Sequence, residues 1–106
     1  MRYQSVLSTQ YVVVVVNALK DGVAYNPTGD PVAIAILPSN PATAPGSGDW
    51  KGATWETTPT AYNVLLLVGP SGGVLDLVQG VYDVWIRITD DPEIPVQLVY
   101  QLEMTP

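Results

Sequence analysis

The densest group of side chains with metal-binding or acid–base chemistry is the segment TDDPEIP, residues 89–95, which holds Asp90, Asp91 and Glu93. Carboxylate oxygens are ligands for Ca²⁺, but calcium takes about six to eight oxygens, and no EF-hand spacing is present to arrange them. Asp and Pro are also typical of tight turns, in which an Asp side chain bonds the nearby backbone. We therefore expect a solvated turn here and no metal site, and the sequence alone leaves ion binding open as the alternative.

The remaining carboxylates offer acid–base catalysis only if two of them face each other across a cleft, as in glycoside hydrolysis. Glu56, Asp76 and Asp83 show no such arrangement, and Asp83 is expected on an outer strand face, where a lone carboxylate is solvated. The chain has no Cys and no His, which leaves Lys20 and Lys51 as the bases for activating a hydroxyl. The sequence thus predicts a protein that is not an enzyme and has no cofactor.

Three Trp residues, Trp50, Trp55 and Trp85, are the other distinctive group. Aromatic rings on a β surface stack on sugars, so a carbohydrate-binding module is one interpretation. Trp is also a usual anchor of protein interfaces, and we favour that interpretation. We expect Trp55 to seal the core at a sheet edge, and Trp50 and Trp85 to pack on each other or on another protein chain.

The composition favours a protein that is covered by partners. The chain of 106 residues has ten acidic and four basic residues, and this charge of −6 argues against contact with nucleic acid phosphates. Charged residues make up 13% of the chain, against about a quarter in average globular proteins. No apolar run suits a signal peptide or reaches the ~20 residues that cross a bilayer. We expect a single domain, made in the cytoplasm, that does not enter a membrane.

Short apolar segments separated by Pro and Gly predict an all-β domain, and about seven strands suit an antiparallel immunoglobulin-like β-sandwich. Residues 38–49, rich in Pro, Ala, Gly and Ser, predict a flexible loop. The sequence leaves open whether residues 1–10 join the chain's own sheet or form an arm on a neighbouring chain. The expected strands are 3–7, 11–18, 32–37, 53–57, 62–68, 81–88 and 96–104.

The segment LVQGVYDVWIRI, residues 77–88, carries the Leu-x-x-Gly-x-Tyr pattern of a tyrosine corner, built here by Leu77, Gly80 and Tyr82. In such a corner the Tyr hydroxyl bonds the backbone a few residues upstream. Alternation along the same strand and along the last strand assigns the inner face. The residues expected inside are Tyr82, Val84, Ile86, Ile88, Val96, Leu98, Tyr100 and Leu102, with the alternation broken at Val99.

Two segments, YVVVVV at residues 11–16 and NVLLLV at residues 63–68, are apolar on both faces. A strand of this kind must be covered on both faces. In the first segment Val12, Val14 and Val16 are expected in the core, and the other face would be covered by the N-terminal segment or by another protein. The candidate partner contacts are therefore Tyr11, Val13, Val15, Trp50 and Trp85.

Residues 48–97 contain the patterns W-x-x-A-T-W-E-T, L-V-G-P-x-G and G-x-Y-x-V-W-x-R-I-T-D-x-P-E-x-P-V. With these patterns, about half of the chain resembles small proteins encoded among the head and tail structural genes of tailed bacteriophages of actinobacteria. The resemblance implies a non-enzymatic virion component with an immunoglobulin-like fold, present in many copies. The first expectation is a capsid decoration or cement protein, and a head–tail connector or tail component is the alternative. The partners would be the major capsid protein, other virion proteins and further copies of the chain.

Overall fold

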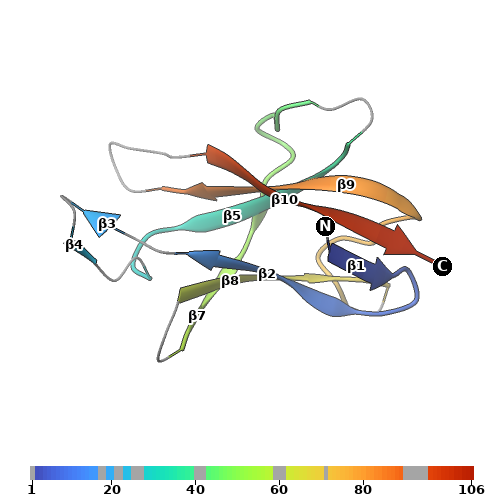
Figure 1. Cartoon of the computed structure of the whole chain (residues 1–106), viewed down its shortest axis with the longest axis horizontal. Helices are drawn as coiled ribbons and strands as arrows, with labels where there is room; N and C mark the ends of the chain where they lie inside the picture. The colour runs from blue at the N-terminus through green and yellow to red at the C-terminus, as the bar shows by residue number, and fades with distance from the viewer. Residues whose placement is uncertain are drawn as a thin grey trace.

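The computed structural model describes residues 2–16, 19–20, 23–24, 28–39, 43–58, 62–70, 72–89 and 96–106. These residues form an all-β fold in which two sheets face each other (Figure 1), as the sequence predicts. They include no helix that could span a membrane. The acidic loop with Asp90, Asp91 and Glu93 lies outside them.

The larger sheet has five strands, in the order β1 (Arg2–Ser5), β10 (Val96–Thr105), β9 (Gly80–Ile88), β5 (Val32–Pro38) and β6 (Lys51–Gly52). The smaller sheet has three strands, in the order β2 (Gln10–Val16), β8 (Tyr62–Val68) and β7 (Thr54–Thr57). A separate pair is formed by β3 (Leu19–Lys20) and β4 (Val23–Ala24). The seven expected strands are therefore present within a residue or two of their expected ends, and β3, β4 and β6 are additional.

The first strand lies beside the last one. β1 pairs in parallel with β10, so that Arg2 is opposite Leu102 and Ser5 is opposite Thr105. The segment is thus a strand of the chain's own larger sheet, and β2 is left at the edge of the smaller sheet. In an immunoglobulin constant-type domain the first strand shares a sheet with the second. The other main strands follow the immunoglobulin-like order, and that type stays an interpretation of the topology.

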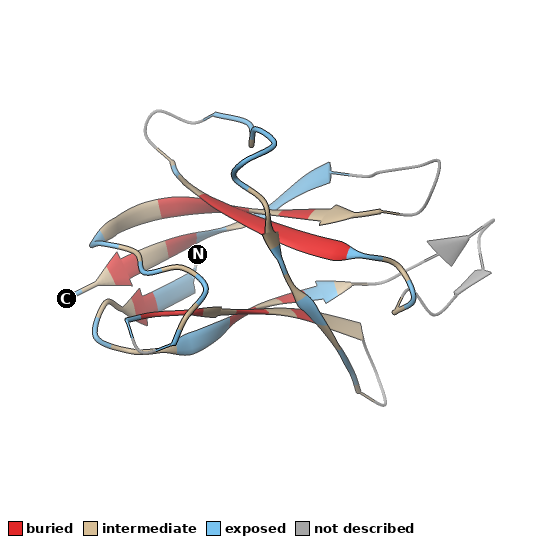
Figure 2. Ribbon diagram, turned by 180° about the vertical axis from the view of Figure 1, so that it is seen from behind, coloured by how far each residue is buried: buried red, intermediate tan, exposed pale blue. Residues whose placement is uncertain are grey.

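The core fills the space between the two sheets, where β-branched and Leu side chains from both meet. Figure 2 shows that the buried residues lie on strands of both sheets. On β2, Val12 and Val14 are each 3% exposed, which agrees with the alternation expected for this strand. Burial of a side chain of this size stabilises the fold by about 1.5–3 kcal/mol. The fully buried centre consists of Ile34, Val64, Leu66, Val68, Val84 and Met104.

β10 changes its inward face at Val99. Its register with β9 shifts between Leu98 and Tyr100, which is the signature of a β-bulge. Beyond the bulge Leu102 is buried in the core, whereas before it Val96 and Leu98 lie on the outer face, nearly half exposed. The prediction that Val96 and Leu98 face the core was wrong, because the extra residue of a bulge reverses the alternation.

A tyrosine hydrogen bond connects β9 to the loop that precedes it. The hydroxyl of Tyr82 donates to the carbonyl oxygen of Val78 at 2.9 Å, which is the bond that defines a tyrosine corner. Leu77 packs against the core, and a Cβ at Gly80 would lie 3.8 Å from the Tyr82 ring. The loop is thereby fixed to the strand that follows it.

The turn after β8 lies tightly against the turn between β1 and β2. Gly69 has a φ of +145°, and a Cβ there would collide with the carbonyl oxygen of Ser8 and with Thr9. Beside this contact the side chain of Gln4, which is 5% exposed, donates to the carbonyl oxygen of Val68 at 3.0 Å. This end of the sandwich is therefore held by backbone packing and a buried side-chain hydrogen bond.

Candidate interaction surface

The outer face of the smaller sheet carries a continuous apolar strip across two strands. We define the β2/β8 face as the outward side chains of Tyr11, Val13, Val15, Leu65 and Leu67. Tyr11 is opposite Leu67 and Val13 is opposite Leu65 in the β2–β8 register. Tyr11 and Val15 are 57% and 55% exposed, and the other three are half-buried. The two strands that read as apolar on both faces thus lie side by side and share this surface.

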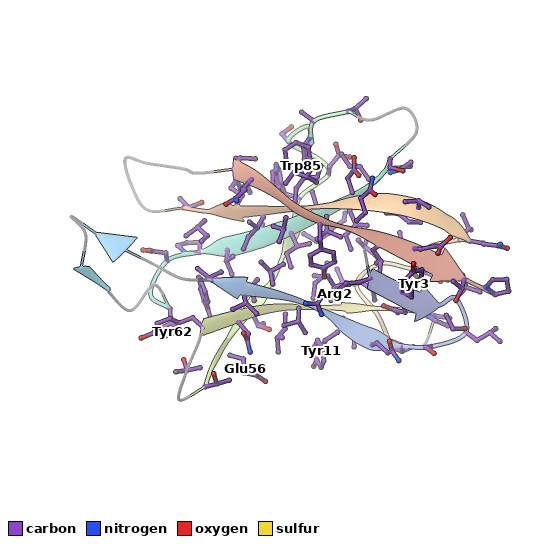
Figure 3. The ribbon with its side chains drawn as sticks, viewed as in Figure 1. Arg2, Tyr3, Tyr11, Glu56, Tyr62 and Trp85 are labelled. Carbon is purple, nitrogen blue, oxygen red and sulfur yellow. The ribbon has the colours of Figure 1, made fainter. Side chains whose placement is uncertain are left out.

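A polar pair borders the strip on the side of β7. Asn63 donates from Nδ2 to Oε1 of Glu56 at 3.2 Å across the two strands. Figure 3 shows Glu56 and Tyr11 projecting from the outer side of the smaller sheet. An apolar centre beside a polar rim is the usual anatomy of a protein contact surface.

The chain's own N-terminal segment does not cover this face. β1 belongs to the larger sheet, beside β10, and so it lies on the opposite layer of the sandwich from the β2/β8 face (Figure 1). The sequence left two alternatives for covering this face, the N-terminal segment or another protein. The N-terminal segment is excluded as far as Arg2–Ser5 is concerned. Cover by another protein stays a prediction.

The open edge of β2 is touched by one side chain from the larger sheet. The hydroxyl of Tyr100 donates to the carbonyl oxygen of Val13 at 3.2 Å. Burial raises the pKa of Tyr100 above its ordinary value of 10.0, and the Arg2 guanidinium and the bond to Val13 partly oppose that rise. The Arg2 guanidinium lies 5.1 Å from the centroid of the Tyr100 ring. Tyr100 is therefore a neutral hydrogen-bond donor at ordinary pH.

The other two candidate contacts, Trp50 and Trp85, lie on the outer face of the larger sheet. Trp85 is opposite Leu98 of β10 and Ala35 of β5, and the ring of Trp50 lies 4.8 Å from the Arg87 guanidinium. Ala35 is fully buried although it faces outward, because these large neighbours cover it. The five candidate contacts thus divide between two opposite faces.

The coloured part of the segment between β5 and β6 lies on this outer side of the larger sheet, next to Trp85 (Figure 3). Its described part, residues 43–50, contains a turn in which Gly46 donates to Oδ2 of Asp49 at 2.7 Å and Asp49 donates to the Gly46 carbonyl at 3.1 Å. Nε1 of Trp85 is buried and has no hydrogen-bond partner among the described residues. The indole N–H of Trp85 is therefore covered by the chain itself and is not presented to solvent.

Trp55 packs against the core from β7, as expected. Its Nε1 donates to the carbonyl oxygen of Asp30 at 2.9 Å. With Trp55 on the smaller sheet, and Trp50 and Trp85 on the larger one, the three rings do not gather into a shared platform. A sugar-binding surface would need such a platform, and the most exposed aromatic residues of the described part of the chain are instead Tyr3 and Tyr11.

The carboxylates considered for acid–base chemistry do not meet. Glu56 lies on the smaller sheet and Asp76 is exposed in the loop before β9. Asp83 is on the outer face of β9 but only 5% exposed, and Gln101 donates to it from Nε2 at 3.3 Å. The prediction that Asp83 is solvated was wrong, because its cross-strand neighbours cover it. The described residues contain no group of three potential metal ligands.

Comparison of the chain with protein-family models, with curated proteins and with solved structures found no match. The interpretation of the surface therefore depends on its own chemistry. The β2/β8 face is apolar, uncharged and continuous, and surfaces of this kind are typically covered by a protein partner.

Proposed function

We propose that this chain is a non-enzymatic structural protein of a phage virion that binds a repeated protein lattice as a capsid decoration protein. The observation that carries the binding part of the proposal is the β2/β8 face, an apolar strip that no strand of the chain's described residues covers. The virion part is supported by the resemblance of residues 48–97 to phage head and tail proteins. The two supports are independent of each other.

The mechanism is the addition of buried apolar area at the junctions of lattice subunits. Each Å² of apolar surface removed from water contributes roughly 25 cal/mol, and a standard contact covers about 800 Å² per partner. Tyr11 and Val15 supply the most exposed part of the β2/β8 face, and Leu65 lies at its centre. A protein that binds only the assembled lattice stabilises assembly by mass action.

The absence of charge on the β2/β8 face determines how binding should respond to salt. All five of its side chains are uncharged, although the chain carries a net charge of −6. Salt screens interactions between exposed charges and leaves apolar contact largely unaffected. We therefore expect lattice binding to change little as the salt concentration is raised.

The test is co-sedimentation with phage capsids prepared without this protein. We expect saturable binding at several hundred copies per particle, an order of magnitude set by closed symmetric lattices. Leu65→Lys places a charge at the centre of the β2/β8 face and should abolish binding. The matched control is Val78→Lys, because Val78 is 75% exposed in the loop before β9 and is not one of the residues of that face.

Three results would contradict the proposal: no saturable binding by the natural chain, equal loss with the control variant, or a Leu65→Lys chain that binds as well as the natural one. Saturation at about the copy number of one ring would instead place the protein at a head–tail connector. Circular dichroism of both variants checks that they remain folded.

A further inference from the structure

Within the described part of the chain, one edge of β2 has no neighbouring strand. β2 is the terminal strand of the order β2-β8-β7, and no described strand pairs with its other side. Its register with β8 is continuous from Gln10 opposite Val68 to Val16 opposite Tyr62, without a bulge. The strand is therefore a regular template onto which a further strand fits.

The contacts of the smaller sheet show which backbone groups point out of this edge. In an antiparallel sheet a residue directs its N–H and C=O to the same side, so that successive residues alternate. The carbonyl of Leu67 accepts a bond of 2.7 Å from Val74, on the side away from β2, and the carbonyl of Val13 meets Tyr100 at the edge. Both observations make Tyr11, Val13 and Val15 the residues whose backbone groups point outward from β2.

The sequence of β2 lacks the features that protect natural edge strands. Proteins usually place a Lys, a Pro, a bulge or a very short strand at an exposed edge. The segment QYVVVVV has none of these, and five of its seven residues are Val. An edge left in this state is suited to strand pairing.

From this edge we propose that two copies of the chain pair through β2, antiparallel, around a twofold axis at Val13. This register sets Val13 against the partner's Val13 and Tyr11 against the partner's Val15. Backbone hydrogen bonds then form between the two copies through the N–H and C=O groups that point out of the β2 edge. The two smaller sheets become one continuous six-stranded sheet, which follows from joining two sheets of three strands.

A second copy fits this edge because the register is self-complementary. Tyr11 and Val15 lie at equal sequence distance on either side of Val13, and they are about equally exposed, at 57% and 55%. The twofold symmetry places Tyr11 of each copy beside the partner's Val15. An aromatic ring beside a β-branched side chain is a favourable cross-strand pair. The strand contains no charged residue, so two copies with a net charge of −6 meet there without direct repulsion.

The existing contact of Tyr100 is compatible with this pairing. A backbone carbonyl has two lone pairs, so the oxygen of Val13 accepts from Tyr100 and from the partner's Val13 together. The pairing does not depend on the proposed virion function. If that function holds as well, the twofold joins two β2/β8 faces into one wider contact surface.

The test is the oligomeric state of the full chain by sedimentation velocity at concentrations up to roughly 500 µM, because a single strand pair covers less area than the ~800 Å² per partner of stable complexes. We expect a monomer–dimer equilibrium in the micromolar range. Tyr11→Lys should raise the dissociation constant by roughly tenfold, since it removes two favourable cross-strand pairs per dimer. Val78→Lys, at an apolar position that is 75% exposed and lies outside β2, should leave it unchanged.

A charge-pair variant tests the register. In Tyr11→Lys with Val15→Glu, the introduced lysine of each copy faces the introduced glutamate of the other only if Tyr11 is opposite the partner's Val15. The double variant should therefore regain most of the affinity lost in Tyr11→Lys. Amide hydrogen exchange at Tyr11, Val13 and Val15 should also slow as the concentration rises.

A chain that stays monomeric over this range would overturn the proposal, and it would leave the edge to a strand from a different protein. A dimer that weakens equally in Val78→Lys, or a double variant weaker than Tyr11→Lys, would also overturn it. Capsid binding is tested with Leu65→Lys, which lies on the central strand β8 and not at the β2 edge. The dimer and the capsid binding can therefore be refuted independently of each other.

Discussion

The buried side chain of Gln4 donates a hydrogen bond to the carbonyl oxygen of Val68 and thereby connects the first strand of the larger sheet to the end of β8 in the smaller one. The same Nε2 lies 3.3 Å from the carbonyl oxygen of Ser8. A single amide group thus joins both sheets and the turn between β1 and β2. The Tyr100 hydroxyl makes another such bond between the layers, to the carbonyl oxygen of Val13.

Replacing this amide should loosen the N-terminal strand. Gln4→Ala leaves the buried carbonyl of Val68 without its side-chain donor and opens a small cavity, so we expect a loss of about 1–3 kcal/mol in the free energy of unfolding. Chemical denaturation measures this loss. Gln97→Ala, at an exposed position on β10, is the control and should change stability by less than about 0.5 kcal/mol. Equal stability of both variants would show that β1 is held by its strand pairing alone.

The tyrosine corner should make a measurable contribution to stability. Tyr82→Phe keeps the ring in the core and removes the 2.9 Å bond to the carbonyl of Val78. We expect a loss of about 0.5–1.5 kcal/mol, seen as a lower denaturation midpoint with an unchanged slope. Tyr3→Phe is the matched control, because Tyr3 is 65% exposed. A Tyr82→Phe chain as stable as the control would mean that packing alone fixes the loop.

A side chain at Gly69 should be poorly tolerated. In Gly69→Ala the new Cβ collides with the carbonyl oxygen of Ser8, and the φ of +145° is unfavourable for any residue with a side chain. We expect a loss of about 2–4 kcal/mol, from strain and overpacking together. Gly48→Ala is the control, because no atom lies within 4 Å of its Cβ position. Thermal unfolding compares the two, and similar midpoints would refute the close contact between the turns.

The buried phenol of Tyr100 predicts a loss of stability in alkali. Because burial raises its pKa above 10.0, the folded chain keeps this proton at pH values where the unfolded chain has released it. Its contribution to stability is therefore complete below pH 10.0 and is lost as the pH rises through the pKa of the folded state. The free energy of unfolding, measured by denaturation between roughly pH 8 and pH 11, should fall more steeply in the natural chain than in Tyr100→Phe. This pH range brackets the ordinary phenol pKa of about 10. Parallel curves would contradict this assignment.

The strands and their inner faces could be predicted from the sequence because alternation is a local property. The Val residues of β2 and the Tyr82 strand follow the period of two, and their core positions agree with it. The same reasoning found the two strands that are apolar on both faces. It also noticed the irregularity at Val99, which the structure explains as a bulge.

The partners of the strands could not be predicted in the same way, because pairing joins segments that are distant in sequence. Nothing local in Arg2–Ser5 indicates that it pairs in parallel with β10, and this placement decides that β2 has an open edge. The burial of Asp83 likewise depends on Gln101, on the neighbouring strand. The outward strip was expected on β2, but its continuation over Leu65 and Leu67 follows only from the β2–β8 register.

The parallel pairing of β1 with β10 also bears on how the chain is made. During synthesis β1 and β2 leave the ribosome before β8 and β10. Until β10 emerges β1 lacks the strand it pairs with, and the valine-rich β2 lacks its own pairing partner until β8 emerges. Long-range pairing of this kind slows folding and prolongs exposure to aggregation. Slower translation should therefore increase the demand for chaperones more than it would in a sandwich closed by local hairpins.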